Sequence, residues 1–497
     1  MSKALKNFVA GQWIGSDKTF DKISPFDGTH VAVVHEASAA MVEEAVTRGH
    51  DVSIGCDASR WGGLPMKQRL AVIHDLADKL MAHVEDLVEA EVADTGRSYW
   101  QASIFDGARA ARLFRAYADA AASLENRSMQ FSGEMGFRGM WYTTRRPKGV
   151  IACICPWNVP LLMACMKVAP ALVMGNSAIL KPSEETPSSA TVLAEVIAAS
   201  DVPEGAFSLL HGFGAGSAGE FLTSHPKVDA ITFTGESRTG SAIMTAAANG
   251  LREVSLELGG KNAALVFEDA HMDAVAEGMT RSAFFNCGQI CFCTERAYVH
   301  RSRFDEYVEM MAGIANGIVI GEKNHNGFNI GPLIGHGHRD KVKALMETVP
   351  THGGEFVAGG GIPSFGDERD NGAFIQPAVA VGSPEDSPFV KQEAFGPVLH
   401  VAPFDDDDEA IALANDTQYG LAACIWTENL SRAHRVAPRV RVGHAWINSW
   451  QIRDLLSPLT CAKASGVGDQ GGRQSLEFSS LPQTVTTRIF EENPACP

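Results

Sequence analysis

The chain has 497 residues, 45% of them hydrophobic and 20% charged, which is long enough for two or three globular domains and unlike a disordered or fibrous protein. Its formal net charge of −17 and pI near 5.4 argue against nonspecific binding to nucleic acids or anionic membranes, which requires basic surfaces. Ten cysteines are too few for a disulfide scaffold in a chain of this length and indicate reduced thiols.

The N-terminal segment contains Lys3 and Lys6, but no apolar core or small-residue cleavage site follows them. This pattern argues against a secretory signal. No apolar stretch in the sequence is long enough to span a bilayer. We therefore expect a cytoplasmic protein.

Residues 67–93 are predicted to form a scaffold helix. Apolar side chains recur there at helical spacing, namely at Leu70, Ile73, Leu76, Leu80, Val84, Leu87 and Val88. Gly96 follows as a plausible C-terminal stop.

From residue 150 onward, short apolar runs alternate with helical segments. The runs lie at 150–155, 178–180, 230–233 and 263–267. This alternation predicts β-α-β units around a buried parallel sheet. A second alternating region follows, with a strand at 297–300 and a helix at 304–318, and we expect it to be the catalytic region.

Two clusters of potential metal ligands have simpler interpretations. The acidic run at 405–409 can be compared with a calcium site, but acids directly before an apolar segment are typical of a helix N-terminus. Cys287, Cys291 and Cys293 contain no Cys-x-x-Cys pair and have no histidine nearby. No metal site is predicted.

His336 and His338 form a third candidate cluster, in a glycine-containing loop. They lack a cysteine or acidic partner at ligand spacing, so we interpret them as surface residues.

Two motifs indicate a reaction. Residues 284–291 read Phe-Phe-Asn-Cys-Gly-Gln-Ile-Cys and end at Cys291, while residues 256–262 read Leu-Glu-Leu-Gly-Gly-Lys-Asn and contain Glu257 in a glycine-rich turn. A thiolate can add to an electrophilic carbon, and a carboxylate can then act as the general base that activates water to release the product. Together the motifs predict covalent catalysis by a cysteine.

With these motifs, the chain resembles the aldehyde dehydrogenase superfamily over nearly its whole length. Further motifs occur in the order typical of that family, at residues 8–13, 155–158, 180–184, 233–240 and 393–397. The probability that so many motifs occur in this order by chance is very small.

The resemblance implies an α/β fold with a Rossmann-like NAD-binding domain, an α/β catalytic domain and a small β bridging domain used for oligomerisation. The NAD-binding domain would comprise residues 1–126 and 147–258, the catalytic domain 259–460, and the bridging domain 127–146 and 475–497. A homodimer or homotetramer acting on a small aldehyde is implied, with no nucleic-acid or membrane partner.

The resemblance also implies the catalytic roles. Cys291 would attack the aldehyde, the side-chain amide of Asn158 and the backbone N–H of Cys291 would form an oxyanion hole, and Glu257 would activate the water that hydrolyses the resulting thioester. The product would be a carboxylic acid. The ordinary cysteine pKa of about 8.5 leaves little thiolate at neutral pH, so the site must supply a base or a positive field.

The cofactor implied by the resemblance is NAD. Its site would include Pro156, Trp157, Lys181, Glu184, Gly214, Gly235, Gly240, Leu258, Glu393 and Phe395. Lys181 and Glu184 would reach the adenosine ribose, where a carboxylate accepts hydrogen bonds from hydroxyls and repels a 2′-phosphate, which favours NAD over NADP. Gly235 would lie at the pyrophosphate. Glu236 departs from the serine common in the family and adds an acid near the phosphates.

A finer resemblance, to the 2-hydroxymuconic and 2-aminomuconic semialdehyde dehydrogenases, concerns the substrate. It rests on residues 336–342, 367–370, 431–436 and 446–450. The last segment leads into Arg453, in a loop that lines the substrate tunnel in the family, and Arg109 lies on a helix beside that tunnel. A guanidinium in a tunnel is costly unless it meets an anion, and a substrate carboxylate would pair with it bidentately. For Arg109, a surface or intramolecular ion pair is an equal alternative.

The chain departs from this subgroup at 457–461 and 468–472, where Ser-Pro-Leu-Thr-Cys replaces Ser-Pro-Phe-Gly-Gly and Gly-Asp-Gln-Gly-Gly replaces Gly-Arg-Glu-Gly-Gly. An aromatic or other unsaturated aldehyde is therefore an alternative substrate. Cys461 is interpreted as a spare buried thiol. A noncatalytic relative and a cysteine-dependent esterase remain alternatives of other classes, but Cys291, Glu257 and Asn158 are all present.

Overall fold

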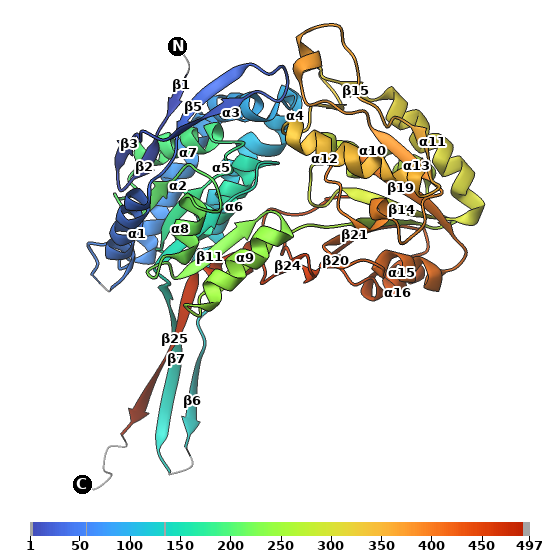
Figure 1. Ribbon diagram of the computed structural model, residues 1–497. Helices are drawn as coiled ribbons and strands as arrows, with labels where there is room; N and C mark the ends of the chain where they lie inside the picture. The colour runs from blue at the N-terminus through green and yellow to red at the C-terminus, as the bar shows by residue number, and fades with distance from the viewer. Residues whose placement is uncertain (1–2, 56, 134–135, 491–497) are drawn as a thin grey trace, which may run out of the picture.

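The structure is a computed structural model, and it describes residues 3–55, 57–133 and 136–490 (Figure 1). Parts of the predicted domain segments, including the end of 475–497, lie outside the described residues. None of the helices in the described ranges is both long enough and apolar enough to cross a bilayer.

An eight-stranded sheet forms the centre of the N-terminal part. Its strands, in spatial order, are β24 (Gly466–Val467), β12 (Glu253–Glu257), β11 (Ala230–Thr234), β8 (Val150–Ile154), β9 (Ser177–Lys181), β10 (Phe207–Leu209), β2 (Asn7–Val9) and β3 (Gln12–Ile14). The strands from β12 to β10 are parallel, as the apolar runs predict. Their carboxyl ends therefore lie along one edge of the sheet.

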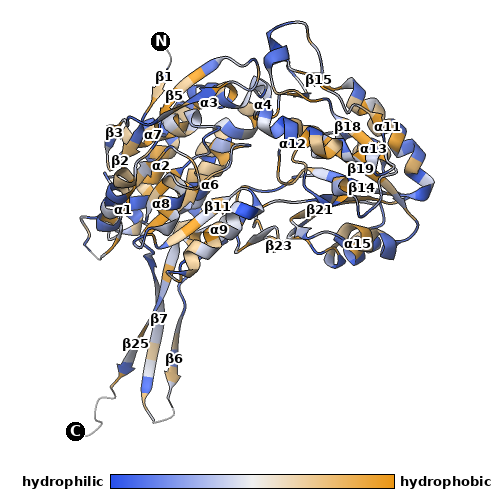
Figure 2. Ribbon diagram, in the orientation of Figure 1, coloured by the Kyte–Doolittle hydropathy of each residue, from blue (hydrophilic) through white to orange (hydrophobic). Residues whose placement is uncertain are grey.

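Helices cover both faces of this sheet, because successive side chains of a buried strand point to opposite sides. Val150 and Ala152 of β8 pack in one core with α1 (Ala39–Ser53), α8 (Ala218–Ser224) and α9 (Ser237–Ala248). Ile151 and Cys153 pack in the other core with α2 (Met66–Ala82), α5 (Ala108–Ala122), α6 (Pro160–Val173) and α7 (Ser188–Ala198). In Figure 2, α6 is mostly hydrophobic, whereas α9 also contains hydrophilic residues.

The predicted single helix at 67–93 is two helices. α2 ends at Ala82 and α3 (Val84–Thr95) begins after His83, which has the non-helical dihedrals φ −108° and ψ 20°. The ring of His83 contacts Asp86 in the first turn of α3, with 2.9 Å between Nδ1 and Oδ2. Gly96 ends α3 in the left-handed conformation, with φ 69°, as its position predicts.

A seven-stranded sheet forms the second α/β unit. Its order is β17 (Glu355–Ala358), β18 (Ala378–Val381), β19 (Val398–Phe404), β14 (Thr294–His300), β13 (Asn262–Val266), β21 (Ala422–Trp426) and β22 (His444–Ile447). The apolar run at 263–267 thus belongs to this sheet and not to the first one. Helices α10 (Met272–Phe284), α11 (Phe304–Gly317), α12 (His336–Met346), α15 (Asp407–Asn415) and α16 (Leu430–Val436) accompany it. The strand and helix predicted after Cys291 are confirmed as β14 and α11.

The acidic run begins a helix. Asp406 is the N-cap of α15, and its carboxylate accepts from the backbone N–H groups of Asp408 and Glu409 at 2.9 Å. Asp405 pairs with Arg301, and Asp408 pairs with Arg439. These acids therefore serve the helix terminus and surface ion pairs.

A three-stranded antiparallel arm projects from the first α/β unit (Figure 1). It consists of β6 (Ser128–Ser132), β7 (Arg138–Pro147) and β25 (Ser480–Ile489), with β7 in the middle. In the pairing of β25 with β7, Ser480 lies opposite Pro147 and Ile489 opposite Arg138. The arm thus joins the chain's C-terminal strand to a hairpin from the N-terminal part.

Smaller elements complete the chain. They are β1 (Lys3–Leu5), β4 (Thr19–Ile23), β5 (His30–His35), β15 (Val319–Ile320), β16 (Asn329–Ile330), β20 (Tyr419–Gly420), β23 (Ala462–Lys463), α4 (Tyr99–Ala102), α13 (Thr348–Thr351), α14 (Pro388–Lys391), α17 (Gly472–Phe478), η1 (Ser103–Gly107), η2 (Phe285–Gly288), η3 (Arg301–Arg303), η4 (Glu368–Asn371) and η5 (Ala437–Arg439).

Candidate active site

The loop before Cys291 has an unusual backbone. Asn286, Cys287 and Gly288 are all left-handed, with φ values of 52°, 55° and 71°. A β-carbon at residue 288 would overlap the carbonyl oxygen of Gly396, so only glycine fits there. This loop follows α10, packs Gly288 against the backbone of Gly396 and leads to the half-buried Cys291.

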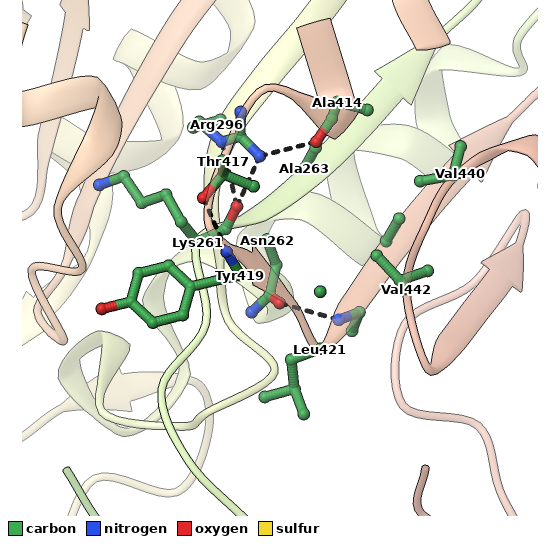
Figure 3. Close-up of a pocket in the computed structure, with 13 residues that line it drawn as sticks. Lys261, Asn262, Ala263, Arg296, Ala414, Thr417, Tyr419, Leu421, Val440 and Val442 are labelled. Atoms are coloured by element: carbon green, nitrogen blue, oxygen red, sulfur yellow. Dashed lines mark hydrogen bonds between the residues drawn. The ribbon is translucent and has the colours of Figure 1, made fainter. Parts of the chain in front are cut away.

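Asn262, at the start of β13, is hydrogen-bonded to the backbone of the loop that contains Cys291, which we call the nucleophile loop. Its side-chain N–H groups donate to the carbonyl oxygens of Cys291 at 2.7 Å and Cys293 at 2.8 Å. Its Oδ1 accepts from the backbone N–H of Ala422 at 3.0 Å (Figure 3). The Trp450 indole N–H also donates to the carbonyl of Phe292, at 2.9 Å. The backbone around Cys291 is thus held on both sides.

Asn158 is part of the same loop network. Its Nδ2 donates to the carbonyl of Gln289 at 2.8 Å, and its own carbonyl accepts from Nδ2 of Asn286 at 2.9 Å. The side chain is buried. The side-chain amide predicted for the oxyanion hole is therefore hydrogen-bonded to the backbone two residues before Cys291.

Glu257 ends β12, at the carboxyl edge of the first sheet. Burial raises the pKa of this carboxyl to about 7, opposed by a hydrogen bond from Cys461 and by the charges of Lys167 and Arg453. Its Oε1 is buried and has no hydrogen-bond partner among the described residues. A carboxyl with a pKa near 7 and a free acceptor oxygen is suited to general-base work at neutral pH.

Cys291 lies within the field of this carboxylate. Burial, and next the charge of Glu257, raise the pKa of its thiol to about 12, while the charge of Arg453 opposes the shift. The isolated chain therefore keeps Cys291 protonated at neutral pH. A base or an additional positive charge must act when the thiol attacks.

Arg453 lies on a loop between β22 and β23 that two indoles hold in place. The Trp446 N–H donates to the carbonyl of Ile452 at 3.3 Å, and Trp450 is bound to Phe292 as described above. The guanidinium carbon of Arg453 lies 5.9 Å from the centre of the Phe292 ring. Its Nε is buried and has no hydrogen-bond partner among the described residues. The loop thus aims a cation at the residue that follows Cys291.

Arg109, on α5, is close enough to Arg453 for the two charges to interact. Burial lowers the pKa of Arg453 to about 10, and the charge of Arg109 is the next cause. Burial also lowers the pKa of Arg109, opposed by the charge of Asp106. Arg453 and Arg109 are both half-buried and their charges repel each other, and Arg453 also acts on Cys291, so its surroundings favour an anion electrostatically.

The residues predicted for the cofactor follow the parallel strands of the first sheet. Pro156 and Trp157 come after β8, Lys181 ends β9, and Gly235 comes after β11. Gly214 lies on an exposed loop between β10 and α8. Ligands of open parallel sheets bind outside this carboxyl edge.

The Gly235 turn has the features of a phosphate cradle. It joins β11 to the twelve-residue helix α9, and Gly240 lets α9 pack closely on Leu258, since a β-carbon there would lie 3.0 Å from Leu258 Cδ1 and closer still to Cδ2. The hydroxyl of Thr234, just before the turn, is buried and has no partner among the described residues. A phosphate at this helix start would meet free donors, so the residues present fit a dinucleotide.

Glu236, whose acidity conflicts with a phosphate site, is turned to the surface. Its carboxylate lies 3.5 Å from Nη2 of Arg238, and both side chains are mostly exposed. The ion pair moderates the negative charge at the start of α9.

The adenosine end of the predicted cofactor site contains a lysine and a carboxylate. Lys181 Nζ donates to the carbonyl of Pro182 at 2.9 Å and lies 3.7 Å from Oε2 of Glu184. Lys181 is buried, whereas Glu184 is partly exposed. The exposed carboxylate is available to hydroxyl groups of a ligand.

Glu393 and Phe395 lie at the junction of the two sheets. Glu393 Oε1 accepts from the backbone N–H of Gly260 at 2.7 Å, and burial raises its pKa to about 8. Phe395 is left-handed, with φ 52°, and packs edge-on against Trp157 with 5.3 Å between ring centres. Strained backbone of this kind persists only where the surroundings hold it.

Glu295 and His338 hold that strained turn, and sequence motifs did not indicate either. The carboxylate of Glu295 accepts from the backbone N–H groups of Ala394 and Phe395 at 2.9 Å and is paired with Lys261 at 2.5 Å. Nε2 of His338 lies 2.8 Å from the carbonyl of Phe395.

The interpretation of both histidines as surface residues is therefore wrong for His338. His336 is exposed, as expected. The ring of His338 is half-buried and lies 5.2 Å from that of Trp157. The prediction failed because a His-Gly-His segment gives no signal of which side chain will turn inward.

Cys461 is a further correction. We interpreted it as a spare buried thiol, but its Sγ lies 3.1 Å from Oε2 of Glu257. The signal available in the sequence was the replacement of the usual glycine at this position.

Comparison with known proteins gives one consistent result. A model of the "Aldehyde dehydrogenase family" matches residues 13–485. A 2-aminomuconic 6-semialdehyde dehydrogenase from a Pseudomonas species is 46% identical over 99% of each chain. A 2-hydroxymuconic semialdehyde dehydrogenase from Pseudomonas sp. (strain CF600) is 45% identical over 98% of this chain and 100% of its own.

Solved structures agree in fold. An aldehyde dehydrogenase from Bacillus cereus in complex with NAD⁺ superposes with a TM-score of 0.92 at 30% identity, over 98% of this chain and 97% of that one. A betaine aldehyde dehydrogenase from Staphylococcus aureus in complex with NAD⁺ has a TM-score of 0.92 at 30% identity, over 97% and 94% of the two chains.

Proposed function

The chain belongs to the aldehyde dehydrogenase family and is an aldehyde-oxidising oxidoreductase that uses a nicotinamide dinucleotide, and we propose that its substrate is a semialdehyde that bears a carboxylate. The proposed semialdehyde is of the 2-hydroxymuconic type formed in aromatic ring catabolism, and its aldehyde group is oxidised to a carboxylic acid. The relatives named for 2-hydroxymuconic and 2-aminomuconic semialdehydes support this choice. The observation that carries it is the guanidinium of Arg453, whose charge acts on Cys291 and also interacts with that of Arg109.

In the proposed first step, the Cys291 thiol adds to the aldehyde carbon and forms a thiohemiacetal. The oxyanion that develops is stabilised by the side-chain amide of Asn158 and the backbone N–H of Cys291. The Arg453 charge favours the thiolate during attack, since it opposes the rise of the Cys291 pKa. When bound, the oxidised nicotinamide would supply the hydride acceptor that converts the thiohemiacetal to a thioester.

In the proposed second step, Glu257 takes a proton from water. The water oxygen bonds to the thioester carbon, the bond between that carbon and the Cys291 sulfur breaks, and the carboxylic acid leaves. The pKa near 7 keeps about half of the Glu257 side chains ionised at neutral pH.

We propose NAD as the preferred form of the cofactor. Glu184 supports this, because an exposed carboxylate beside Lys181 accepts hydrogen bonds from ribose hydroxyls and repels a 2′-phosphate. Trp157, Glu393, Phe395 and the turn at Gly235 would hold the remainder of the dinucleotide.

The substitution Arg453→Ala tests the substrate anchor. Loss of a charge-assisted bidentate pair corresponds to about 2–3 kcal/mol, so kcat/KM for carboxylated semialdehydes should fall about 30- to 160-fold. Neutral aldehydes of similar size lose only the effect of the Arg453 charge on the Cys291 thiolate, so their kcat/KM should fall by a clearly smaller factor. Steady-state NADH formation by the purified variant measures both.

Arg301→Ala is a matched control, because Arg301 is exposed and paired with Asp405 on the surface. It should leave both substrates unaffected. Equal losses on charged and neutral aldehydes for Arg453→Ala would remove the anchor role. In that case an aromatic or other unsaturated aldehyde becomes the better substrate, and the buried Leu459 in place of the subgroup's phenylalanine becomes the feature to study.

We also propose a cytoplasmic location and a homo-oligomer. The described cysteines are free thiols, as expected in a reducing compartment. Exposed apolar residues on the arm support oligomerisation, namely Met129, Phe131 and Leu481.

A further inference from the structure

The Cys461 thiol is hydrogen-bonded to the carboxylate of Glu257. Sγ of Cys461 lies 3.1 Å from Oε2 of Glu257, and the thiol is the donor. This contact spans 204 residues of sequence and joins the end of β12 to the segment just before β23. It is therefore a feature of the folded site and not of a local turn.

The fold fixes the position of this sulfur. Glu257 of β12 lies directly opposite Gly466 of β24 in the antiparallel register. A β-carbon at Gly466 would lie 2.8 Å from Sγ of Cys461, so the sulfur fills the space over this glycine. The neighbouring hydroxyl of Thr460 donates to the carbonyl of Gly443 at 2.6 Å and anchors the segment. Strand pairing and anchoring thus bring the thiol to the carboxylate.

The chemistry of the pair defines Cys461 as a donor. Burial and the Glu257 charge raise the pKa of the Cys461 thiol far above neutrality, so it remains protonated and is a poor nucleophile. The same hydrogen bond lowers the pKa of Glu257, against the larger effect of burial.

The two oxygens of Glu257 consequently differ. Oε2 is occupied by the thiol, whereas Oε1 is buried and has no partner among the described residues. We propose that Cys461 is a positioning residue, which donates its S–H to Oε2, stabilises the ionised form of Glu257 and leaves Oε1 as the oxygen that receives the proton of the hydrolytic water. This inference rests on the proposed role of Glu257 in the deacylation step.

The consequence concerns only the deacylation step. As water attacks the thioester, its proton moves to Oε1, the new C–O bond forms, and the C–S bond to Cys291 breaks. A carboxyl that lacks the thiol donor is a weaker acid and is less ionised below neutral pH. At pH values well above the pKa of Glu257, the carboxyl is ionised with or without the donor, and the two rates should converge.

The test compares Cys461→Ala, which removes the donor, with Cys461→Ser, which keeps an O–H donor at the same position. A nitrophenyl ester acylates Cys291 whatever the aldehyde substrate is, and the decay of the acyl adduct can be followed by intact-protein mass from about pH 5.5 to 9. We expect Cys461→Ala to deacylate about threefold more slowly than the wild type near pH 6 and at the same rate near pH 9. Cys461→Ser should retain the wild-type profile.

Two outcomes overturn the inference. One is a wild-type pH profile for Cys461→Ala, and the other is a loss by the same factor at every pH, which indicates a structural effect. Equal melting temperatures of the two variants confirm that the comparison is made on folded protein. Glu257→Gln measured in parallel separates this inference from the proposed function: if that variant deacylates like the wild type, the base assignment fails and Cys461 has no base to position.

Discussion

At the residue scale, the central feature is the buried carboxyl of Glu257 close to the half-buried thiol of Cys291. Burial raises the pKa of both groups, and the charge of Glu257 raises the pKa of the Cys291 thiol further, because two negative charges in one apolar site are unfavourable. Glu257 and Cys291 are therefore both protonated in part or in full near neutral pH. This arrangement suits a sequence of steps in which the thiolate is needed first and the carboxylate later.

The pH dependence of deacylation follows from the Glu257 pKa of about 7. The base must be ionised, so the deacylation rate should rise about tenfold for each pH unit below 7 and level off above it. Glu257→Gln, which cannot accept the proton, should slow deacylation about 10²- to 10⁴-fold and accumulate an acyl-enzyme visible by intact mass. Turnover of this variant without a detectable adduct would contradict the role given to Glu257.

The residues that sequence motifs identified are those whose chemistry is local. Cys291, Glu257 and Asn158 stand in short segments that carry their own neighbours. In the structure Asn158 is hydrogen-bonded to the loop of Cys291, and the charge of Glu257 acts on Cys291. His338 and Cys461 could not be assigned in this way. Their roles depend on partners 57 and 204 residues away, which no spacing rule brings together.

At the element scale, the nucleophile loop depends on the conformation of Gly288. Its φ of 71° and its contact with the Gly396 carbonyl leave no space for a side chain. Gly288→Ala should displace the loop, reduce NADH turnover at least about 100-fold and lower the melting temperature, because both strain and overlap must be relieved.

Gly313→Ala is the matched control for this prediction. Gly313 lies within α11, and a β-carbon there meets nothing within 4 Å. The control should retain full activity with equal or slightly higher stability. An active and equally stable Gly288→Ala variant would show that the loop tolerates rearrangement.

Apolar runs predicted the strands well, because each buried parallel strand is a continuous hydrophobic segment. β8, β9, β11, β13 and β14 all occur where such runs lie. Periodicity could not locate the break at His83, since the apolar spacing continues across it. It also could not assign β13 to its sheet, because strand order is decided by tertiary packing.

The predicted domain boundaries remain predictions. The two large sheets and the arm have the strand composition given above, yet β24, near the C-terminus, pairs with β12 of the first sheet. This pairing of β24 with β12 brings the segment around Cys461 close to Glu257. β24 lies between the predicted catalytic domain, which ends at residue 460, and the bridging segment, which begins at 475, so its position in the sequence does not indicate that it joins the first sheet.

At the scale of the whole molecule, the arm leaves apolar side chains exposed. Met129, Phe131 and Leu481 lie on β6 and β25, and β6 is exposed along its whole length. Figure 2 shows mixed hydrophobic and hydrophilic residues along the arm. An isolated arm of this kind is stabilised when another copy of the chain covers it.

We therefore expect the wild type to be a dimer or tetramer, and the double variant Met129→Asp with Leu481→Asp to shift toward smaller species in light scattering. Leu430→Asp serves as the control, since Leu430 is 69% exposed and lies on α16, in the second α/β unit away from the arm (Figure 1). A monomeric wild type would contradict this expectation.

The most direct test of the account is the aldehyde specificity of the wild-type protein. NADH formation should be measured with two aldehyde panels, one of muconate-type semialdehydes that carry a carboxylate and one of neutral aromatic aldehydes, with NADP in parallel. The account predicts a strong preference for the carboxylated panel with NAD, because Arg453, whose charge acts on Cys291, favours an anion there. A preference for neutral aldehydes would contradict it.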